Sequence, residues 1–328
     1  CHGNYLSLIG MYFDMIISAS RRTDIPSYYS DWFYNRITEG FVYVRNPMNY
    51  HQISQISLSP DVVDGIVFWT KNPTPMIDRL GELEKYIYYF QFTLNSYGTD
   101  VERNVPSKND IVIPTFQKLS SLIGKERIVW RYDPILFNEK YTMDYHIKYF
   151  QLLADKLSDY TEKCTVSFLD FYKNTQRNIA PLGIIPPSPG QVEEIMGIFS
   201  TIAKEHGIYV DTCAEEVDLE KFGIGHARCI DKERFERIGN YQLDVEKDKN
   251  QRSICGCMAS IDIGTYNTCK NGCLYCYANY SQKTVSSNSR QHNPVSPLLF
   301  GSVSEDDVIK PRLVRSCIEC QTSLFGEE

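Results

Sequence analysis

The stretch YIYYFQFTL, residues 86–94, consists almost entirely of aromatic and other apolar side chains. A strand with one face in solvent alternates apolar and polar residues, whereas a strand covered on both faces reads as a nearly continuous apolar run. The stretch therefore predicts a buried strand of a parallel sheet.

Similar runs recur between positions 15 and 215, and they are MIISAS (15–20), DGIVFWT (64–70), RIVWRY (127–132), CTVSFLDF (164–171) and IYVDTC (208–213). Helical patterns lie between them: one follows Thr142, and another begins at Ser188, an N-cap residue with Pro189 at the first helical position. A pair of runs at 41–45 and 52–58 reads as a hairpin or two edge strands. Strand and helix alternate as in a parallel α/β fold, and six units indicate an open or closed α/β barrel.

The composition of the 328 residues, 42% hydrophobic with a net charge of −7, is that of a globular enzyme. Such a net charge disfavours binding to duplex nucleic acid, although the sequence still allows a local basic groove. No apolar run is long enough to cross a membrane, and the segment 1–14 lacks a signal-peptide pattern, so we expect a cytoplasmic protein without a membrane span. Eleven cysteines in a reducing compartment indicate metal binding or redox chemistry.

Three regions are expected: an N-terminal extension (1–14), the α/β barrel units (15–215), and a Cys-rich C-terminal region (216–328) that completes the barrel. Polar residues follow the predicted strands at their carboxyl ends, where α/β folds carry their chemistry. The candidates for holding a cofactor or an anionic substrate are Arg21, Arg22, Asp24, Lys71, Asn72, Arg131 and Asp133. Arginine pairs grip carboxylate or phosphate, and Asp24 or Asp133 could accept ribose hydroxyls. Arg21 and Arg22 could equally form a structural ion pair.

The segment TCKNGCLYCYANY, residues 268–280, spaces Cys269, Cys273 and Cys276 as C-x3-C-x2-C. Three thiolates on a short loop can hold three irons of a [4Fe–4S] cluster and leave the fourth iron open to a small molecule. Zinc is the alternative, but a structural zinc site favours a closed set of four ligands.

A second group of cysteines consists of Cys213, Cys229, Cys255 and Cys257. These four thiolates could close a second [4Fe–4S] cluster, as an electron relay or a substrate anchor. Zinc could occupy the same set, with His226 in place of one cysteine. Cys317 and Cys320 could complete this site, form a redox pair or have no role.

The string CKNGCLYCYAN resembles the radical SAM superfamily, and most of all its spore photoproduct lyase-like branch. The resemblance implies a partial (β/α)6 barrel and an oxygen-sensitive enzyme that cleaves S-adenosylmethionine reductively to a 5′-deoxyadenosyl radical, which abstracts hydrogen from an unknown substrate. It also implies an electron donor such as ferredoxin or flavodoxin. On this resemblance Cys269, Cys273 and Cys276 are the cluster ligands, and Tyr275 lies near the adenine.

Two features depart from the superfamily pattern: the motif comes late in the chain, and no Gly-Gly-Glu segment follows. The late position is explained if ASIDIGTYN, residues 259–267, is a strand that takes the place of the usual first strand, as in a circular permutation. The whole chain also resembles a bacterial family of unknown function, through SASRRTDIP, FWTKNP, RYDPI, TCAE and the terminal cysteines.

Three other functions remain open from the sequence. The first is an Fe–S electron-transfer or redox-sensing protein, which would need a fourth protein ligand for the cluster. DNA photoproduct repair is a narrower option within the radical SAM class. A zinc-stabilised nucleic-acid-binding protein is the third, and the missing basic stripe counts against it.

Overall fold

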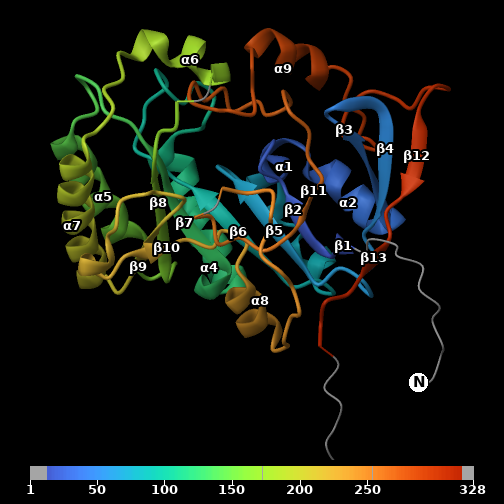
Figure 1. Cartoon of the computed structure of the whole chain (residues 1–328), viewed down its shortest axis with the longest axis horizontal. Coiled ribbons are helices and arrows are strands. Elements are labelled where there is room, and N and C mark those ends of the chain that lie inside the picture. Colours follow the sequence, from blue (N-terminus) through green and yellow to red (C-terminus); the bar gives the residue numbers. More distant parts are fainter. Residues whose placement is uncertain (1–12, 172, 253, 320–328) are drawn as a thin grey trace, which may run out of the picture.

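The computed structural model describes residues 13–171, 173–252 and 254–319 (Figure 1). Its centre is an eight-stranded parallel sheet in the order β10-β9-β8-β7-β6-β5-β2-β11. The strands are β2 (Ile16–Ala19), β5 (Gly65–Thr70), β6 (Tyr88–Thr93), β7 (Ile128–Ile135), β8 (Lys163–Phe168), β9 (Tyr209–Thr212), β10 (Gly225–His226) and β11 (Ile261–Asp262). The six strands predicted between positions 15 and 215 are confirmed. β10 escapes prediction because so short a strand shows no periodic pattern.

The α-helices are α1 (Ile25–Tyr28), α2 (Ser30–Glu39), α3 (Thr74–Ile77), α4 (Ile113–Ile123), α5 (Met143–Leu157), α6 (Lys173–Ile179), α7 (Pro189–Glu205), α8 (Lys232–Gly239) and α9 (Gln282–Ser289). Short helical turns are η1 (Leu80–Leu83), η2 (Lys108–Val112), η3 (Lys125–Arg127), η4 (Ala180–Leu182) and η5 (Glu220–Phe222). The predicted starts of α5 and α7 are confirmed, because Thr142 and Ser188 cap them. In α7, Ser188 and Gln191 form a capping box.

The two faces of the sheet have different covers, which explains the nearly continuous apolar strands. Alternate residues such as Phe68 and Trp130 belong to the core shared with α2, α4, α5 and α7. Their neighbours Val67 and Val129 point to the opposite face and pack against a second cluster, supplied by residues of the 227–258 stretch and by Cys317. The C-terminal region therefore covers the face that the helices leave open.

The remaining strands form two small sheets. β3 (Phe41–Asn46) and β4 (Asn49–Ser57) are antiparallel, which confirms the predicted hairpin, and β12 (Val308–Pro311) adds to β4 in parallel. β1 (Phe13–Asp14) pairs with β13 (Val314–Arg315). The three-stranded sheet lies beside α2, at the right of Figure 1.

The expected strand within residues 259–267 is confirmed as β11, which pairs in parallel with β2 at one edge of the main sheet. Asp262 of β11 accepts hydrogen bonds from Ser18 Oγ at 3.0 Å, Ser20 Oγ at 2.6 Å and the Arg21 amide at 2.8 Å. Gly264 follows it, and a Cβ there would lie 2.1 Å from Ser20 Oγ. β10 forms the other edge, so the sheet is open within the described residues. No described helix is long and apolar enough to span a membrane.

Candidate functional site

The loop with the C-x3-C-x2-C motif follows β11 and is tied down through its backbone carbonyl groups. Tyr29 Oη donates to the Thr268 carbonyl at 2.6 Å, and Asn279 Nδ2 donates to that of Cys269 at 2.8 Å. Asn104 donates twice, from Nδ2 to the Lys270 carbonyl at 2.7 Å and from its amide to that of Asn271 at 3.0 Å. These bonds fix the loop while leaving its thiols free for ligation.

Within the loop, Asn271 and Gly272 also pack closely against the rest of the protein. Asn271 Nδ2 donates to Asp24 Oδ2 at 2.9 Å, and its Oδ1 accepts from Tyr28 Oη at 2.9 Å. Gly272 has φ of +66°, and a Cβ there would lie 2.9 Å from Asn104 Nδ2. Glycine is therefore required both for the left-handed backbone and for the space.

The three motif thiols are electrostatic neighbours; Cys269 is buried, and Cys273 and Cys276 are half-buried. Burial raises the pKa of Cys269 and Cys273 to about 12 and that of Cys276 to about 11. Opposing effects come from Lys71 beside Cys273 and from hydrogen bonds of backbone amides to Cys269 and Cys276. The thiolate is the metal ligand, so these thiols would ionise at neutral pH only with a cation to replace the proton.

Among the residues that the structure describes, no three His, Cys, Asp or Glu side chains converge closely enough to hold a single metal ion. A tetrahedral zinc ion would require sulfur atoms about 3.8 Å apart, given its bond lengths. A cubane cluster needs no such convergence, because each thiolate binds a different iron. The donor set of Cys269, Cys273 and Cys276 fits the cluster in its chemistry, its shared loop and its backbone amide donors.

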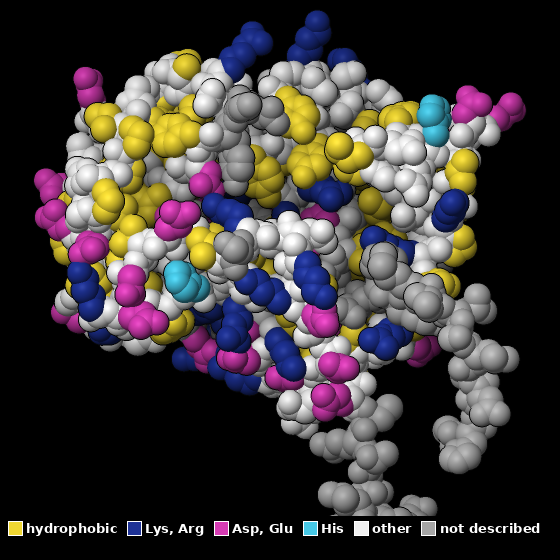
Figure 2. All heavy atoms as spheres, in the orientation of Figure 1, with side chains coloured by type: hydrophobic (Ala, Val, Ile, Leu, Met, Phe, Trp, Pro, Cys, Tyr) yellow, Lys and Arg dark blue, Asp and Glu magenta, His cyan; other side chains and the backbone are white. Residues whose placement is uncertain are grey.

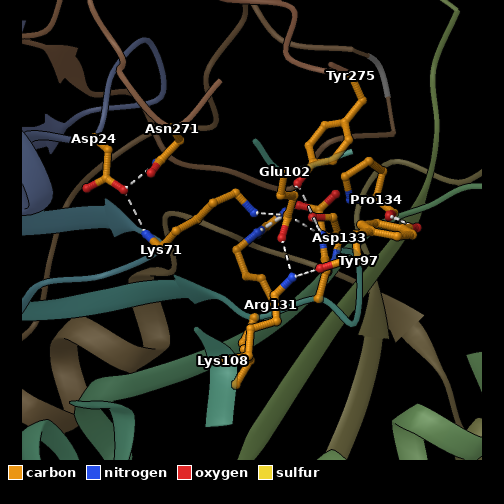
Figure 3. A network of polar contacts seen from close by, with 12 residues as sticks. Asp24, Lys71, Tyr97, Glu102, Lys108, Arg131, Asp133, Pro134, Asn271 and Tyr275 are labelled. Carbon is orange, nitrogen blue, oxygen red and sulfur yellow. Dashed lines mark hydrogen bonds and ion pairs between the residues drawn. The ribbon is translucent and has the colours of Figure 1, made fainter. Parts of the chain in front are cut away.

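A buried carboxylate, Glu102, lies next to this loop at the centre of a polar network (Figure 3). Its oxygens accept hydrogen bonds from Lys71 Nζ at 2.7 Å, from Lys108 Nζ at 2.6 Å and from the Tyr275 hydroxyl. Burial opposes ionisation of Glu102, but the two lysines outweigh it and lower the pKa to about 2. Glu102 therefore joins Tyr275 of the motif to Lys71, which follows β5.

The network continues to the carboxyl end of β7 through Asn95. Asn95 Nδ2 lies 3.3 Å from Tyr275 Oη and donates to the Asp133 carbonyl at 2.8 Å, while the Asp133 amide donates to Asn95 Oδ1 at 2.8 Å. Arg131 forms an ion pair with the Asp133 carboxylate. Side chains that follow or end the neighbouring strands β5, β6 and β7 thus meet the cysteine loop at the carboxyl-terminal end of the sheet.

The structure brings most of the predicted site residues to this carboxyl-terminal end of the sheet. Asp24, Lys71, Arg131, Asp133 and Tyr275 belong to the network of Figure 3. Arg21 and Arg22 lie nearby through Asp262, whose carboxylate is 3.9 Å from Arg22 Nε. Asn72 differs, because its side-chain oxygen accepts from Thr74 Oγ1 at 2.6 Å within a local turn.

The second group of cysteines also assembles, although its members are far apart in the sequence. Cys229 Sγ lies 3.4 Å from Cys213 Sγ and also contacts Cys257, which in turn contacts Cys255. The four sulfurs are thus linked as a chain rather than around one point. Arg131 Nη1 donates to Cys229 Sγ at 3.0 Å. Cys317 packs in the same apolar cluster, His226 is exposed, and Cys320 lies outside the described residues.

A model described as a domain of unknown function, DUF1848, matches residues 16–278. The chain belongs to this family. The DUF1848 match begins at β2 and ends just after Cys276, so it includes both cysteine groups and the network of Figure 3. No curated protein matches the chain.

Three residues of the DUF1848 site are missing from the sequence prediction: Glu102, Lys108 and Asp262. Glu102 and Lys108 lie in the loop after β6, where charged residues are ordinary and nothing in the local pattern marks burial. Asp262 had a detectable signal, since a carboxylate in an apolar predicted strand needs donors.

Glu215 adds a titratable group to the same end of the sheet. It follows Cys213, and its Oε1 accepts from the Phe168 amide at 2.8 Å. Burial raises the pKa of Glu215 to about 7, and the nearby carboxylates of Asp170 and Asp133 act in the same direction. A carboxyl group that titrates near neutral pH can exchange protons with a bound substrate.

Proposed function

We propose that this protein is a radical SAM enzyme, in which Cys269, Cys273 and Cys276 hold a [4Fe–4S] cluster. When bound, such a cluster supplies reductive cleavage of S-adenosylmethionine to a 5′-deoxyadenosyl radical, which abstracts hydrogen from a substrate still to be identified. The reaction consumes an electron, so a donor of the ferredoxin or flavodoxin class belongs to the proposal.

The observation that carries the proposal is the place of the motif loop. It follows β11, at the carboxyl end of a parallel strand, where α/β folds position their chemistry. If β11 is counted first, the strand order across the sheet is also the chain order, from β11 through β2, β5, β6, β7 and β8 to β9 and β10. This order supports a partial barrel that is circularly permuted relative to the usual radical SAM arrangement.

The surrounding residues orient the loop and tune its charge. Lys71 places a positive charge beside Cys273, which favours its thiolate. Asp24 positions the loop through Asn271. Lys71 and Asp24 are held by short hydrogen bonds, whereas Arg22 is partly exposed and lies as far as 3.9 Å from Asp262, so within this proposal Arg22 is the better candidate for the carboxylate of S-adenosylmethionine or for an anionic substrate. Within this proposal, Tyr275 lies near the adenine of bound S-adenosylmethionine.

Nucleic acid remains a less favoured substrate. Figure 2 shows Lys and Arg side chains interspersed with Asp and Glu over the face in view, without a continuous basic stripe among the described residues there. A duplex-binding repair enzyme would use such a stripe to neutralise phosphates. Small molecules are therefore the substrate class to test first.

The proposal is tested by anaerobic reconstitution with iron and sulfide, followed by addition of S-adenosylmethionine and dithionite and chromatography of 5′-deoxyadenosine. We expect deoxyadenosine from the native protein and from a Cys164→Ala control, because Cys164 belongs to β8 and packs in the apolar core. We expect none from the variant Cys269→Ala/Cys273→Ala/Cys276→Ala. Full cluster loading without cleavage would favour an electron-transfer protein, and zinc without iron would refute both assignments.

A further inference from the structure

The second group of cysteines lies on the face of the sheet opposite α2, α4, α5 and α7, under the C-terminal region. Cys229 is 3% exposed, Cys255 8% and Cys257 2%, and Cys213 is half-buried. Cys213 and Cys229 follow two neighbouring strands, β9 and β10, while Cys255 and Cys257 come from the segment before β11. Three separate parts of the chain therefore deliver sulfur to one buried place.

Two guanidinium groups border these sulfurs. Arg131 Nη1 is 3.0 Å from Cys229 Sγ, and Arg21 lies beside Cys257 and Cys229. Both guanidinium groups lie close to the Trp69 ring, at 5.2 Å for Arg21 and 5.3 Å for Arg131 from its centroid. Cation–π contacts with the Trp69 ring thus help to place both guanidinium groups beside the cysteine group.

The two guanidinium groups differ in how close a carboxylate lies to them. Arg131 forms an ion pair with Asp133, whereas within the described residues no carboxylate lies within 4.0 Å of the Arg21 guanidinium, although Asp262 is nearby. Anionic sulfur beside these guanidinium groups would compensate their charge further. The positions of Arg21 and Arg131 are therefore compatible with thiolate ligands in this group.

We infer that Cys213, Cys229, Cys255 and Cys257 form a metal-thiolate centre, distinct from the motif loop and independent of the proposed radical chemistry. Four protein ligands close the coordination of the centre, so it has no open position for S-adenosylmethionine. An iron–sulfur cluster fits this group better than zinc, because the four sulfurs are linked as a chain and among the described residues no three potential ligands surround a single point, as one zinc ion would require. Arg131 contacts both this centre and the network of Figure 3, which places the two cysteine groups in one continuous polar structure.

The test uses the full chain carrying Cys269→Ala/Cys273→Ala/Cys276→Ala, so that the motif loop cannot bind metal. The variant is loaded anaerobically either with iron and sulfide or with zinc, desalted, and its metal content is measured. We expect about four irons per chain to remain bound and zinc to be lost on desalting, whereas retention of about one zinc in place of iron would contradict an iron–sulfur centre. Adding Cys229→Ser should remove that metal, whereas adding Cys164→Ala should not. No retained metal in either arm would overturn the inference.

A second measurement, on the unmutated protein, does not depend on how the variants fold. Iodoacetamide labelling and mass spectrometry before and after chelation should show Cys213, Cys229, Cys255 and Cys257 becoming reactive together when metal is removed. A disulfide between Cys213 and Cys229 in anaerobically purified protein would overturn the inference. If the reconstituted unmutated protein forms no deoxyadenosine while the triple variant still retains its metal, only the proposed function is refuted.

Discussion

Asp24 Oδ2 accepts one hydrogen bond from Asn271 Nδ2 at 2.9 Å and another from the Lys71 amide at 2.8 Å. Its other oxygen caps α1 by accepting from the Ser27 amide at 3.0 Å. One buried carboxylate thus joins the loop after β2, the loop after β5 and the cysteine loop after β11. The contact thus joins segments that are 247 positions apart in the sequence.

Replacing Asp24 by alanine should therefore weaken both the fold and the cysteine loop. The change removes a helix cap and leaves buried donors without acceptors, so we expect a loss of about 2–4 kcal/mol in the free energy of unfolding by urea. Asp31→Ala is the control, because Asp31 pairs with Arg79 at the surface and its loss should cost less than about 1 kcal/mol. Equal losses for the two variants would contradict the role assigned to Asp24.

Glu102 should make the free energy of unfolding depend on pH in the acid range. Its pKa of about 2 in the folded state lies below the unfolded value of about 4.3. Its stabilising contribution is therefore complete above about pH 4.3 and is lost as the pH falls to about 2. We expect Glu102→Gln to be less stable than the native protein by about 3 kcal/mol at neutral pH, with the difference shrinking in acid.

The comparison is made by urea unfolding at a series of pH values, with Glu84→Gln as the control. Glu84 is exposed, so its variant should follow the native protein at every pH. A Glu102→Gln variant that stays equally destabilised down to pH 2 would show that the carboxylate is not held ionised by Lys71 and Lys108.

Glu215 should change the stability of the protein with pH in the opposite direction to Glu102. Its folded pKa of about 7 lies above the unfolded value, so the folded state binds the extra proton between those two values. The native protein should therefore lose stability relative to Glu215→Gln as the pH rises from about 4.3 to about 7, by up to about 4 kcal/mol. The neighbouring, exposed Glu216 supplies the control Glu216→Gln. A carboxyl titration of Glu215 by carbon-13 NMR near its ordinary value would contradict the prediction.

Gly272→Ala should distort the cysteine loop, because the new methyl group meets Asn104 and the backbone has positive φ. We expect a loss of about 1–3 kcal/mol in stability and a lower iron content after reconstitution. Gly183→Ala is a matched control, since Gly183 has φ of +57° but nothing lies within 4 Å of its added Cβ. If both variants load iron as the native protein does, the loop does not depend on close packing against Asn104.

Much of the architecture was predictable from local pattern alone. Continuous apolar runs identified the six strands β2 and β5 to β9, and the capping residues Thr142 and Ser188 marked two helix starts. The aspartate-containing run at 259–267 indicated β11. Other features had no such signal: β10 is too short for periodicity, and Glu102 resembles any loop carboxylate until its burial between two lysines is seen.

The sequence by itself determined the parallel α/β class, the position of the cysteine motif and the residue types at the strand ends, because periodicity, capping and ligand spacing are properties of neighbouring residues. Only the tertiary structure decided which distant groups meet. It placed β11 against β2, gathered Cys213, Cys229, Cys255 and Cys257, and enclosed Glu102. Burial and partner choice depend on how strands order in the sheet and how the C-terminal region crosses its open face, which no local stretch of sequence specifies.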